Sequence, residues 1–174
     1  MTTRESQWFR RVPALATAHI HAGDVEAMDG LGMRLAQGLA PPLVITLRGE
    51  LGSGKTTLVR AMLRALGWTG PVKSPTYSLL EHYLLSSLYF YHFDFYRVED
   101  PNEWESTGFA EYFTKDSVCM VEWPDRVGGY LPPGDLAVEI AYAGPESLAG
   151  RDLTFIAHSP AGLRCLRTVA PGEG

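Results

Sequence analysis

The segment at residues 49–56 constrains the fold of this chain more than any other. It reads Gly-Glu-Leu-Gly-Ser-Gly-Lys-Thr and matches the phosphate-binding pattern G-x-x-x-x-G-K-[S/T] at every defined position. In such a loop, consecutive backbone N–H groups and the N-terminus of the following helix surround phosphate oxygens, and glycines allow the close approach. Lys55 is predicted to reach the β- and γ-phosphates of a nucleotide, and the Thr56 hydroxyl is predicted to bind Mg²⁺.

The residues on both sides of this loop fit the strand–loop–helix arrangement that the motif requires. Residues 43–47 form a short apolar run that is typical of a buried strand. After the loop, apolar residues recur at helical spacing as far as Leu66, and Gly67 is suited to end the helix. This context favours the phosphate-binding interpretation over its alternative, an ordinary glycine-rich turn.

The rest of the chain divides into short elements. Asp24 is suited to cap a helix that runs to about Leu39 and ends at Pro41-Pro42. Other expected strands are 15–21, 118–121, 135–142 and 152–157, with a hairpin at 77–85 and 88–97, short helices within 101–113 and a short helix after Pro160. We divide this single-domain chain into an N-terminal tail with the first strand (1–23), a main body (24–160) and a C-terminal tail (161–174).

Composition and charge narrow the classes of function. The chain has 174 residues, a net charge of −5 and only three lysines. A large nucleic-acid-binding surface needs clustered basic residues, so such a surface is not expected here. No stretch approaches the ~20 apolar residues of a membrane-spanning helix, and the N-terminus lacks the apolar core of a signal peptide. We therefore expect a cytoplasmic protein with no membrane contact, in which Cys119, within an apolar run, belongs to the core.

Two acidic residues at or near strand ends are candidates for a Mg²⁺-nucleotide site. In the second strand of the expected hairpin, His92, Asp94 and Tyr96 share one face, and the aromatic residues between them can pack against the core from the other. Glu122 ends the apolar run 118–121, where a parallel strand would deliver its carboxylate beside the phosphate-binding loop. Mg²⁺ prefers such hard oxygen ligands and takes few of them from a protein. The alternatives are a salt-bridged strand residue for Asp94 and a surface acid for Glu122.

A third candidate lies in the loop that follows the phosphate-binding helix. Ser74-Pro75-Thr76 occupies the position where GTPase-like proteins carry a threonine that senses the γ-phosphate and Mg²⁺, and Pro75 restricts the backbone there. A plain turn is the alternative for this segment.

Four motifs together resemble one known family. The phosphate-binding loop is followed by Val-Lys-Ser-Pro-Thr-Tyr at 72–77, Tyr-His-Phe-Asp-Phe-Tyr-Arg at 91–97 and Val-Glu-Trp-Pro at 121–124. Their order and spacing resemble the bacterial TsaE (YjeE) ATPases over about residues 24–157. The resemblance implies an α/β fold of the P-loop NTPase type, with a mainly parallel sheet flanked by helices. The expected hairpin would be an antiparallel insertion in that fold.

The resemblance also implies a Mg²⁺-dependent ATPase that supports the formation of threonylcarbamoyladenosine beside the tRNA anticodon. The implied ligands are ATP and Mg²⁺. The implied partners are the threonylcarbamoyl transferase (TsaD) and its companion subunit (TsaB), with tRNA contacted only indirectly through the complex.

Site residues carry over from the family position by position. Lys55, Asp94 and Glu122 are the implied catalytic residues, and Thr56, Glu122 and Asp94 the implied metal-binding residues. Trp123 flanks the site and is a candidate for contact with the nucleotide or with a partner. Packing in the core is the alternative for this residue. Arg151 matches a family Gly-Arg pair that approaches the nucleotide, although the loop before it is longer here. The implied nucleotide-binding set is Gly52, Ser53, Gly54, Lys55, Thr56, Thr57, Val25, Thr76, Trp123 and Arg151.

Two other functions remain open on the sequence. A small-molecule kinase uses the same loop, but kinases of this kind usually carry an arginine-rich lid, and no such cluster follows residue 121. A non-enzymatic ATP-sensing adaptor would bind the nucleotide only to control a partner. Arg97 and Arg126 are candidates for an internal arginine finger, with structural roles as the alternative; without a finger, slow turnover and stimulation by a partner are expected.

Overall fold

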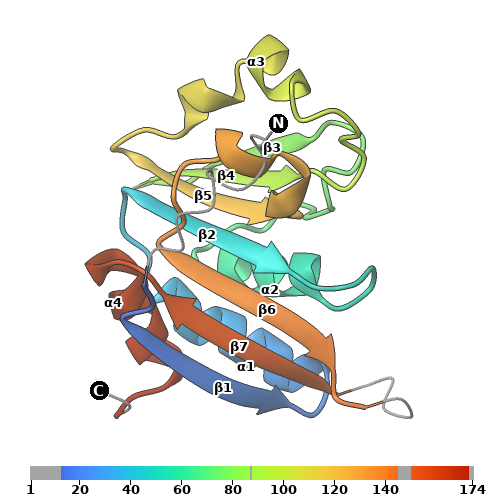
Figure 1. Ribbon diagram of the computed structural model, residues 1–174. Helices are drawn as coiled ribbons and strands as arrows, with labels where there is room; N and C mark the ends of the chain where they lie inside the picture. Colours follow the sequence, from blue (N-terminus) through green and yellow to red (C-terminus); the bar gives the residue numbers. More distant parts are fainter. Residues whose placement is uncertain (1–12, 87, 145–149, 173–174) are drawn as a thin grey trace.

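A seven-stranded mixed sheet forms the centre of the computed structural model, which describes residues 13–86, 88–144 and 150–172. The strands lie in the order β1-β7-β6-β2-β5-β4-β3 (Figure 1). The four central strands run parallel to one another, and the pairings β1–β7, β7–β6 and β4–β3 are antiparallel. The bounds are β1 Ala16–Ala22, β2 Leu43–Arg48, β3 Leu80–Leu84, β4 Tyr89–Asp94, β5 Ser117–Glu122, β6 Leu136–Tyr142 and β7 Arg151–Ala157.

The helices are distributed unequally over the two faces of the sheet. Helices α1 (Val25–Ala36), α2 (Lys55–Ala65) and α4 (Pro160–Val169) lie behind the sheet in the view of Figure 1. The short α3 (Glu103–Thr107) and the 3₁₀ turn η2 (Phe109–Tyr112) pack near β4 and β5 on the other side. Two further 3₁₀ turns, η3 (Pro124–Arg126) and η4 (Gly128–Tyr130), follow β5.

The core has two parts because residues alternate between the two faces of each strand. Phe90, Val118 and Met120 belong to the larger cluster, which the sheet shares with α1, α2 and α4. Phe93 and Cys119 belong to a smaller, aromatic cluster with α3 and η2. The expected burial of Cys119 is therefore confirmed. On the aromatic face of the 88–97 strand, Phe93 and Phe95 are buried and Tyr91 is half-buried.

Most expected elements are present near their expected positions. The strand before the phosphate-binding loop is β2, and the helix after it is α2. Asp24 caps α1, since its Oδ1 accepts a hydrogen bond from the Ala27 N–H at 2.8 Å. Residues 1–12 lie outside the described part of the chain.

Two expectations about the sheet were wrong. The hairpin begins later than expected, at Leu80, and it is not an insertion, because β4 also pairs in parallel with β5 inside the main sheet. The sheet as described is not mainly parallel, because β1 and β7 add two antiparallel pairings at one side and β3 adds one at the other. The parallel arrangement holds for the four central strands that position the site.

The division at residue 160 does not correspond to a break in the structure. Residues assigned to a C-terminal tail form most of α4, whose Cys165, Leu166 and Val169 are buried. Ser159 begins this helix and Pro160 occupies its first turn. Within the described residues, no helix is long and apolar enough to cross a membrane.

Candidate functional site

Three chain segments meet in a pocket at the C-terminal edge of the parallel strands. The loop between β2 and α2 forms one side, and the ends of β4 and β5 form the other. Because β4 and β5 are parallel neighbours, Asp94 lies directly opposite Glu122 in the strand register. The pocket has a volume of about 220 Å³. Residues from these three segments and from the loop at 74–76 line it: Leu51, Gly52, Gly54, Lys55, Thr56, Thr57, Ser74, Thr76, Asp94, Tyr96, Glu122 and Trp123.

The start of α2 faces this pocket without a side-chain cap. Its N-cap is Gly54, which has a φ of 107° and provides no capping hydrogen bond. At Gly49 the backbone has a φ of 151°, and a Cβ there would lie 2.4 Å from the carbonyl oxygen of Ile140. The loop conformation therefore requires glycine at both positions. An uncapped helix start presents N–H donors and a positive dipole end, which suit an anion such as phosphate.

Lys55 is held over the pocket by the loop itself. Its side chain donates hydrogen bonds to the carbonyl oxygens of Gly49 and Glu50, at 2.8 and 2.9 Å. The ammonium also lies 4.3 Å from the centre of the Trp123 ring. Burial lowers the pKa of Lys55, while the nearby carboxylates of Glu122 and Asp94 oppose that shift. The ammonium is thus a concentrated positive charge in a poorly hydrated position.

Glu122 links the helix to the sheet beneath it. Its Oε1 accepts a hydrogen bond from the Thr56 hydroxyl at 2.8 Å and lies 2.8 Å from Nε2 of His92. Glu122 is 3% exposed and His92 is fully buried. The side-chain oxygens of Thr56 and Glu122 are hard ligands of the type that Mg²⁺ prefers.

Asp94 holds the loop at residues 74–76 against the end of β4. Its Oδ2 accepts hydrogen bonds from the hydroxyls of Ser74 and Thr76, the latter at 3.2 Å. Its Oδ1 accepts one from the backbone N–H of Tyr96 at 3.0 Å. The predicted sensor threonine and the predicted second acid therefore form one hydrogen-bonded group.

Arg151, at the start of β7, braces the phosphate-binding loop from outside the pocket. Its guanidinium donates to the carbonyl oxygens of Ser53 and Gly52, at 2.9 and 3.3 Å. It also stacks 4.2 Å from the ring centre of Tyr142, whose hydroxyl donates to the Leu51 carbonyl at 3.0 Å.

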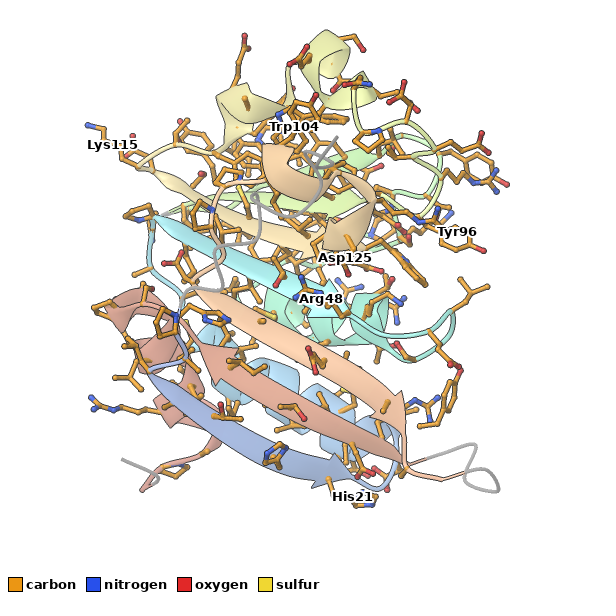
Figure 2. The ribbon with its side chains drawn as sticks, in the orientation of Figure 1. His21, Arg48, Tyr96, Trp104, Lys115 and Asp125 are labelled. Atoms are coloured by element: carbon orange, nitrogen blue, oxygen red, sulfur yellow. The ribbon has the colours of Figure 1, made fainter. Side chains whose placement is uncertain are left out.

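The other arginines near this edge are engaged elsewhere. The guanidinium carbon of Arg97 lies 4.3 Å from the ring centre of Tyr77. The guanidinium carbon of Arg126 lies 5.9 Å from the ring centre of Tyr96. Arg48 pairs with Asp125 at 3.0 Å, and Figure 2 shows these two side chains together where β2 ends.

A Mg²⁺ ion fits the chemistry of this donor set. No group of three or more His, Cys, Asp or Glu residues suited to a metal ion occurs in the described ranges, so a cage built only from such side chains is not present there. Mg²⁺ usually keeps several waters and takes one or two carboxylates together with phosphate oxygens. Thr56, Glu122 and Asp94 around one pocket meet that requirement.

The sequence and the fold of this chain are similar to those of known proteins. A family model described as "Threonylcarbamoyl adenosine biosynthesis protein TsaE" matches residues 22–151. This chain belongs to the TsaE family. The match extends from the end of β1 through the phosphate-binding loop, β4 and β5 to Arg151 at the start of β7, so it contains all the segments that form the pocket.

Individual relatives agree with this TsaE assignment. A tRNA threonylcarbamoyladenosine biosynthesis protein TsaE from Haemophilus influenzae is 48% identical over 100 residues, which cover 58% of this chain and 63% of that protein, somewhat less than two thirds of its length. The Bacillus subtilis protein of the same name is 41% identical over 117 residues, which cover 67% of this chain and 71% of that protein. The crystal structure of Bacillus subtilus YdiB has a TM-score of 0.74 and 28% identity, covering 91% of this chain and 97% of that one.

The structure places most residues predicted for a TsaE site around one pocket. Gly52, Gly54, Lys55, Thr56, Thr57, Thr76, Asp94, Glu122 and Trp123 all line it. Three others lie outside the lining. Ser53 is a buried residue of the loop itself, Arg151 donates to carbonyl oxygens of the loop, and Val25, at the start of α1, is 65% exposed.

Sequence reasoning assigned no role to His92 in this TsaE-family site. It placed His92 on the same face as Asp94 but did not connect it to Glu122. The contact follows from the parallel pairing of β4 with β5, which sequence reasoning did not predict because it treated the hairpin as an insertion. The available signal was a polar residue two positions before Asp94 in an otherwise aromatic strand.

Proposed function

We propose that this chain is a Mg²⁺-dependent P-loop ATPase that supports threonylcarbamoyladenosine formation on tRNA. In this proposal it acts with the threonylcarbamoyl transferase and its companion subunit and does not itself modify the adenosine. The observation that carries the ATPase part is the uncapped start of α2, which faces a pocket containing Lys55, Thr56 and Glu122. Membership of the TsaE family supports the role in tRNA modification, because the relatives' names state it.

Each group in the pocket has a defined part in binding and hydrolysing ATP. The first N–H groups of α2 and the loop would bind phosphate oxygens, and Lys55 would exchange its two carbonyl partners for the β- and γ-phosphates. Thr56 would hold Mg²⁺, with Glu122 and Asp94 as neighbouring acidic groups. When bound, Mg²⁺ supplies charge neutralisation on the phosphates. Glu122 would also orient the attacking water, because its carboxylate lies beside the helix start.

Slow turnover in isolation is part of the proposal. Arg97 and Arg126 stack on tyrosines, and Arg151 contacts the carbonyl oxygens of the loop. An arginine that reaches the transferring phosphoryl group accelerates related reactions by ~10³-fold or more. A partner that supplied such a cation, or that reoriented one of these arginines, would therefore control the rate.

Contact with tRNA is proposed to be indirect. The net charge of −5 and the three lysines give the chain little affinity for a phosphate backbone at physiological salt. The partner subunits would supply the tRNA-binding surface.

The decisive experiment is an ATPase assay of the purified protein with and without the transferase pair. We expect weak Mg²⁺-dependent hydrolysis alone and a clear increase with the pair. Stoichiometric transfer of phosphate to an added small molecule would instead identify a kinase, and ATP binding with no hydrolysis under any condition would identify an adaptor.

A second experiment tests the partners and the RNA separately. Gel filtration of the protein with tRNA alone, and then with the transferase pair, is run with and without Mg-ATP. We expect no complex with tRNA alone and a complex with the pair that ATP favours, because residues 74–77 can order around the γ-phosphate. Tight binding to free tRNA contradicts the indirect role.

A further inference from the structure

The buried contact between His92 and Glu122 is not needed to build a phosphate-binding loop. His92 lies on β4, which β5 separates from β2 and the loop, and its side chain is fully buried. Its Nε2 lies 2.8 Å from Oε1 of Glu122, and its Nδ1 has no hydrogen-bond partner among the described residues. A buried imidazole with one unsatisfied nitrogen costs free energy that an apolar side chain of similar size would not cost.

The direction of the hydrogen bond follows from the chemistry of the two groups. An ionised carboxylate only accepts hydrogen bonds, so the His92 nitrogen that contacts Glu122 carries the proton. The imidazole therefore donates through Nε2. Its Nδ1 is the nitrogen without a hydrogen-bond partner among the described residues.

The two hydrogen bonds to Glu122 fall on the same oxygen. Thr56 and His92 both contact Oε1, from the helix side and the sheet side respectively. Within the described ranges, no hydrogen bond reaches Oε2 of Glu122. One oxygen is thus fixed by two donors, which sets the rotation of the carboxylate and leaves the other oxygen available in a residue that lines the pocket.

We infer that His92 is a positioning residue for ATP hydrolysis: by donating to Oε1, it orients Glu122 so that Oε2 meets the attacking water or the hydrated metal. This inference rests on the proposed ATPase function. It assigns to His92 an effect on the rate of hydrolysis and little effect on ATP binding, which depends mainly on the loop and on Lys55. Groups that orient an acting carboxylate or ligand in this way typically change activity by ~10–100-fold when removed.

The test compares three variants with the wild type, each assayed with the transferase pair present. His92→Met removes the donor and keeps an apolar side chain of similar length. His92→Gln places an amide N–H near the position of Nε2. Phe90→Leu, two residues earlier on the same buried face, is the matched control without a polar contact.

We expect His92→Met to lower kcat by about tenfold or more with KM for ATP changed less than about threefold, and His92→Gln to recover most of the rate. Phe90→Leu should lower Tm without lowering kcat.

A double-mutant cycle separates positioning from a general structural role. If His92 acts through Glu122, then adding His92→Met to Glu122→Ala should cause no further loss of kcat. The inference would be overturned if His92→Met lowered kcat by the same factor in the wild type and in Glu122→Ala. A wild-type kcat in the His92→Met single variant would also overturn it. If His92→Met does not yield folded protein, His92→Asn replaces it, because the shorter asparagine amide cannot reach Glu122. Absence of hydrolysis by the wild type itself would contradict the proposed ATPase function, which is a different result.

Discussion

Helices α2 and α4 each follow a strand of the same sheet and lie on the same face of it, yet they begin in opposite ways. At the start of α4, the Ser159 hydroxyl accepts a hydrogen bond from the Gly162 N–H at 3.1 Å and contacts Asp135 at 2.5 Å. At the start of α2, Gly54 offers no side chain, and the nearby Lys55 turns back to the loop carbonyls.

The difference shows what each helix start contributes. The first N–H groups of a helix have no partner within the helix, so a side-chain cap adds stability to the fold. Helix α4 has this cap and gains that stability from its own chain. Helix α2 lacks it, and in the proposed function its first N–H groups would bind phosphate oxygens of the nucleotide. Substitutions at these two helix starts and around the pocket can therefore separate effects on stability from effects on binding.

Replacement of Lys55 by alanine should have the largest effect on binding. The change removes a buried ammonium at the uncapped start of α2, so we expect the Kd for Mg-ATP to rise by about 100-fold, equivalent to ~3 kcal/mol. Calorimetric titration gives the affinity. The thermal midpoint of the nucleotide-free protein should change little, because the hydrogen bonds of the Lys55 side chain go to two carbonyl oxygens of the loop rather than to the core. Wild-type affinity in this variant would remove the binding role from α2.

Replacement of Glu122 by glutamine should lower hydrolysis far more than binding. The amide keeps the size of the side chain and can still accept from Thr56, but it loses the negative charge. We expect kcat to fall by about 100-fold or more, with the Kd for Mg-ATP changed by less than about threefold. Steady-state hydrolysis with the transferase pair measures the first quantity and calorimetry the second. An unchanged kcat would exclude Glu122 from the hydrolytic machinery.

Replacement of Asp94 by asparagine should act in the same direction but less strongly. Asp94 anchors Ser74 and Thr76 and is an acidic neighbour of the proposed metal position. We expect kcat to fall by about tenfold, with a higher Mg²⁺ concentration needed for half-maximal rate. A Mg²⁺ titration of the hydrolysis rate is the measurement. A wild-type titration curve would leave Asp94 with only the structural task of holding its loop.

Replacement of Ser159 by alanine should change stability and leave nucleotide affinity intact. Loss of the α4 cap and of the contact to Asp135 should cost about 1–2 kcal/mol of unfolding free energy. Urea denaturation measures the stability, and calorimetry of Mg-ATP binding is the control. A large loss of affinity would show that the two helix starts are not independent.

Replacement of Asp24 by alanine should have the smallest effect. Asp24 caps α1 by accepting from the Ala27 N–H, and it is solvent-exposed, so about 0.5–1 kcal/mol of stability should be lost. Its neighbour Val25 belongs to the nucleotide-binding set that the family resemblance implies. A loss of ATP affinity greater than about threefold would therefore assign the start of α1 to the nucleotide site.

Short-range patterns made the local structure around the loop at residues 49–56 predictable. The loop at residues 49–56, its preceding strand and its following helix are all visible as a motif between apolar segments. The Asp24 cap could also be recognised, because capping depends on residues only a few positions apart. Likewise, Glu122 could be placed at a strand end from the apolar run before it.

Long-range pairing was not predictable in the same way. Local patterns show that residues 89–94 form a strand, but they do not show that this strand lies beside β5. The neighbourhood of Asp94, Glu122 and His92 depends on that pairing. Similarly, Ser159 and Pro160 signal the start of a helix, but the docking of α4 depends on the sheet face that β6 and β7 present to it.

The parallel register that sets Asp94 opposite Glu122 has a consequence for how sequences of this kind can vary in length. Each acid ends a six-residue strand, and side chains alternate faces along both strands. One residue inserted within either strand would therefore turn that strand's acid away from the pocket. The crossover between the two strands, with α3 and η2, packs against one face of both strands through the smaller aromatic cluster. We therefore expect insertions and deletions in the exposed turns of the crossover to leave both acids in place, and those within β4 or β5 to displace one of them.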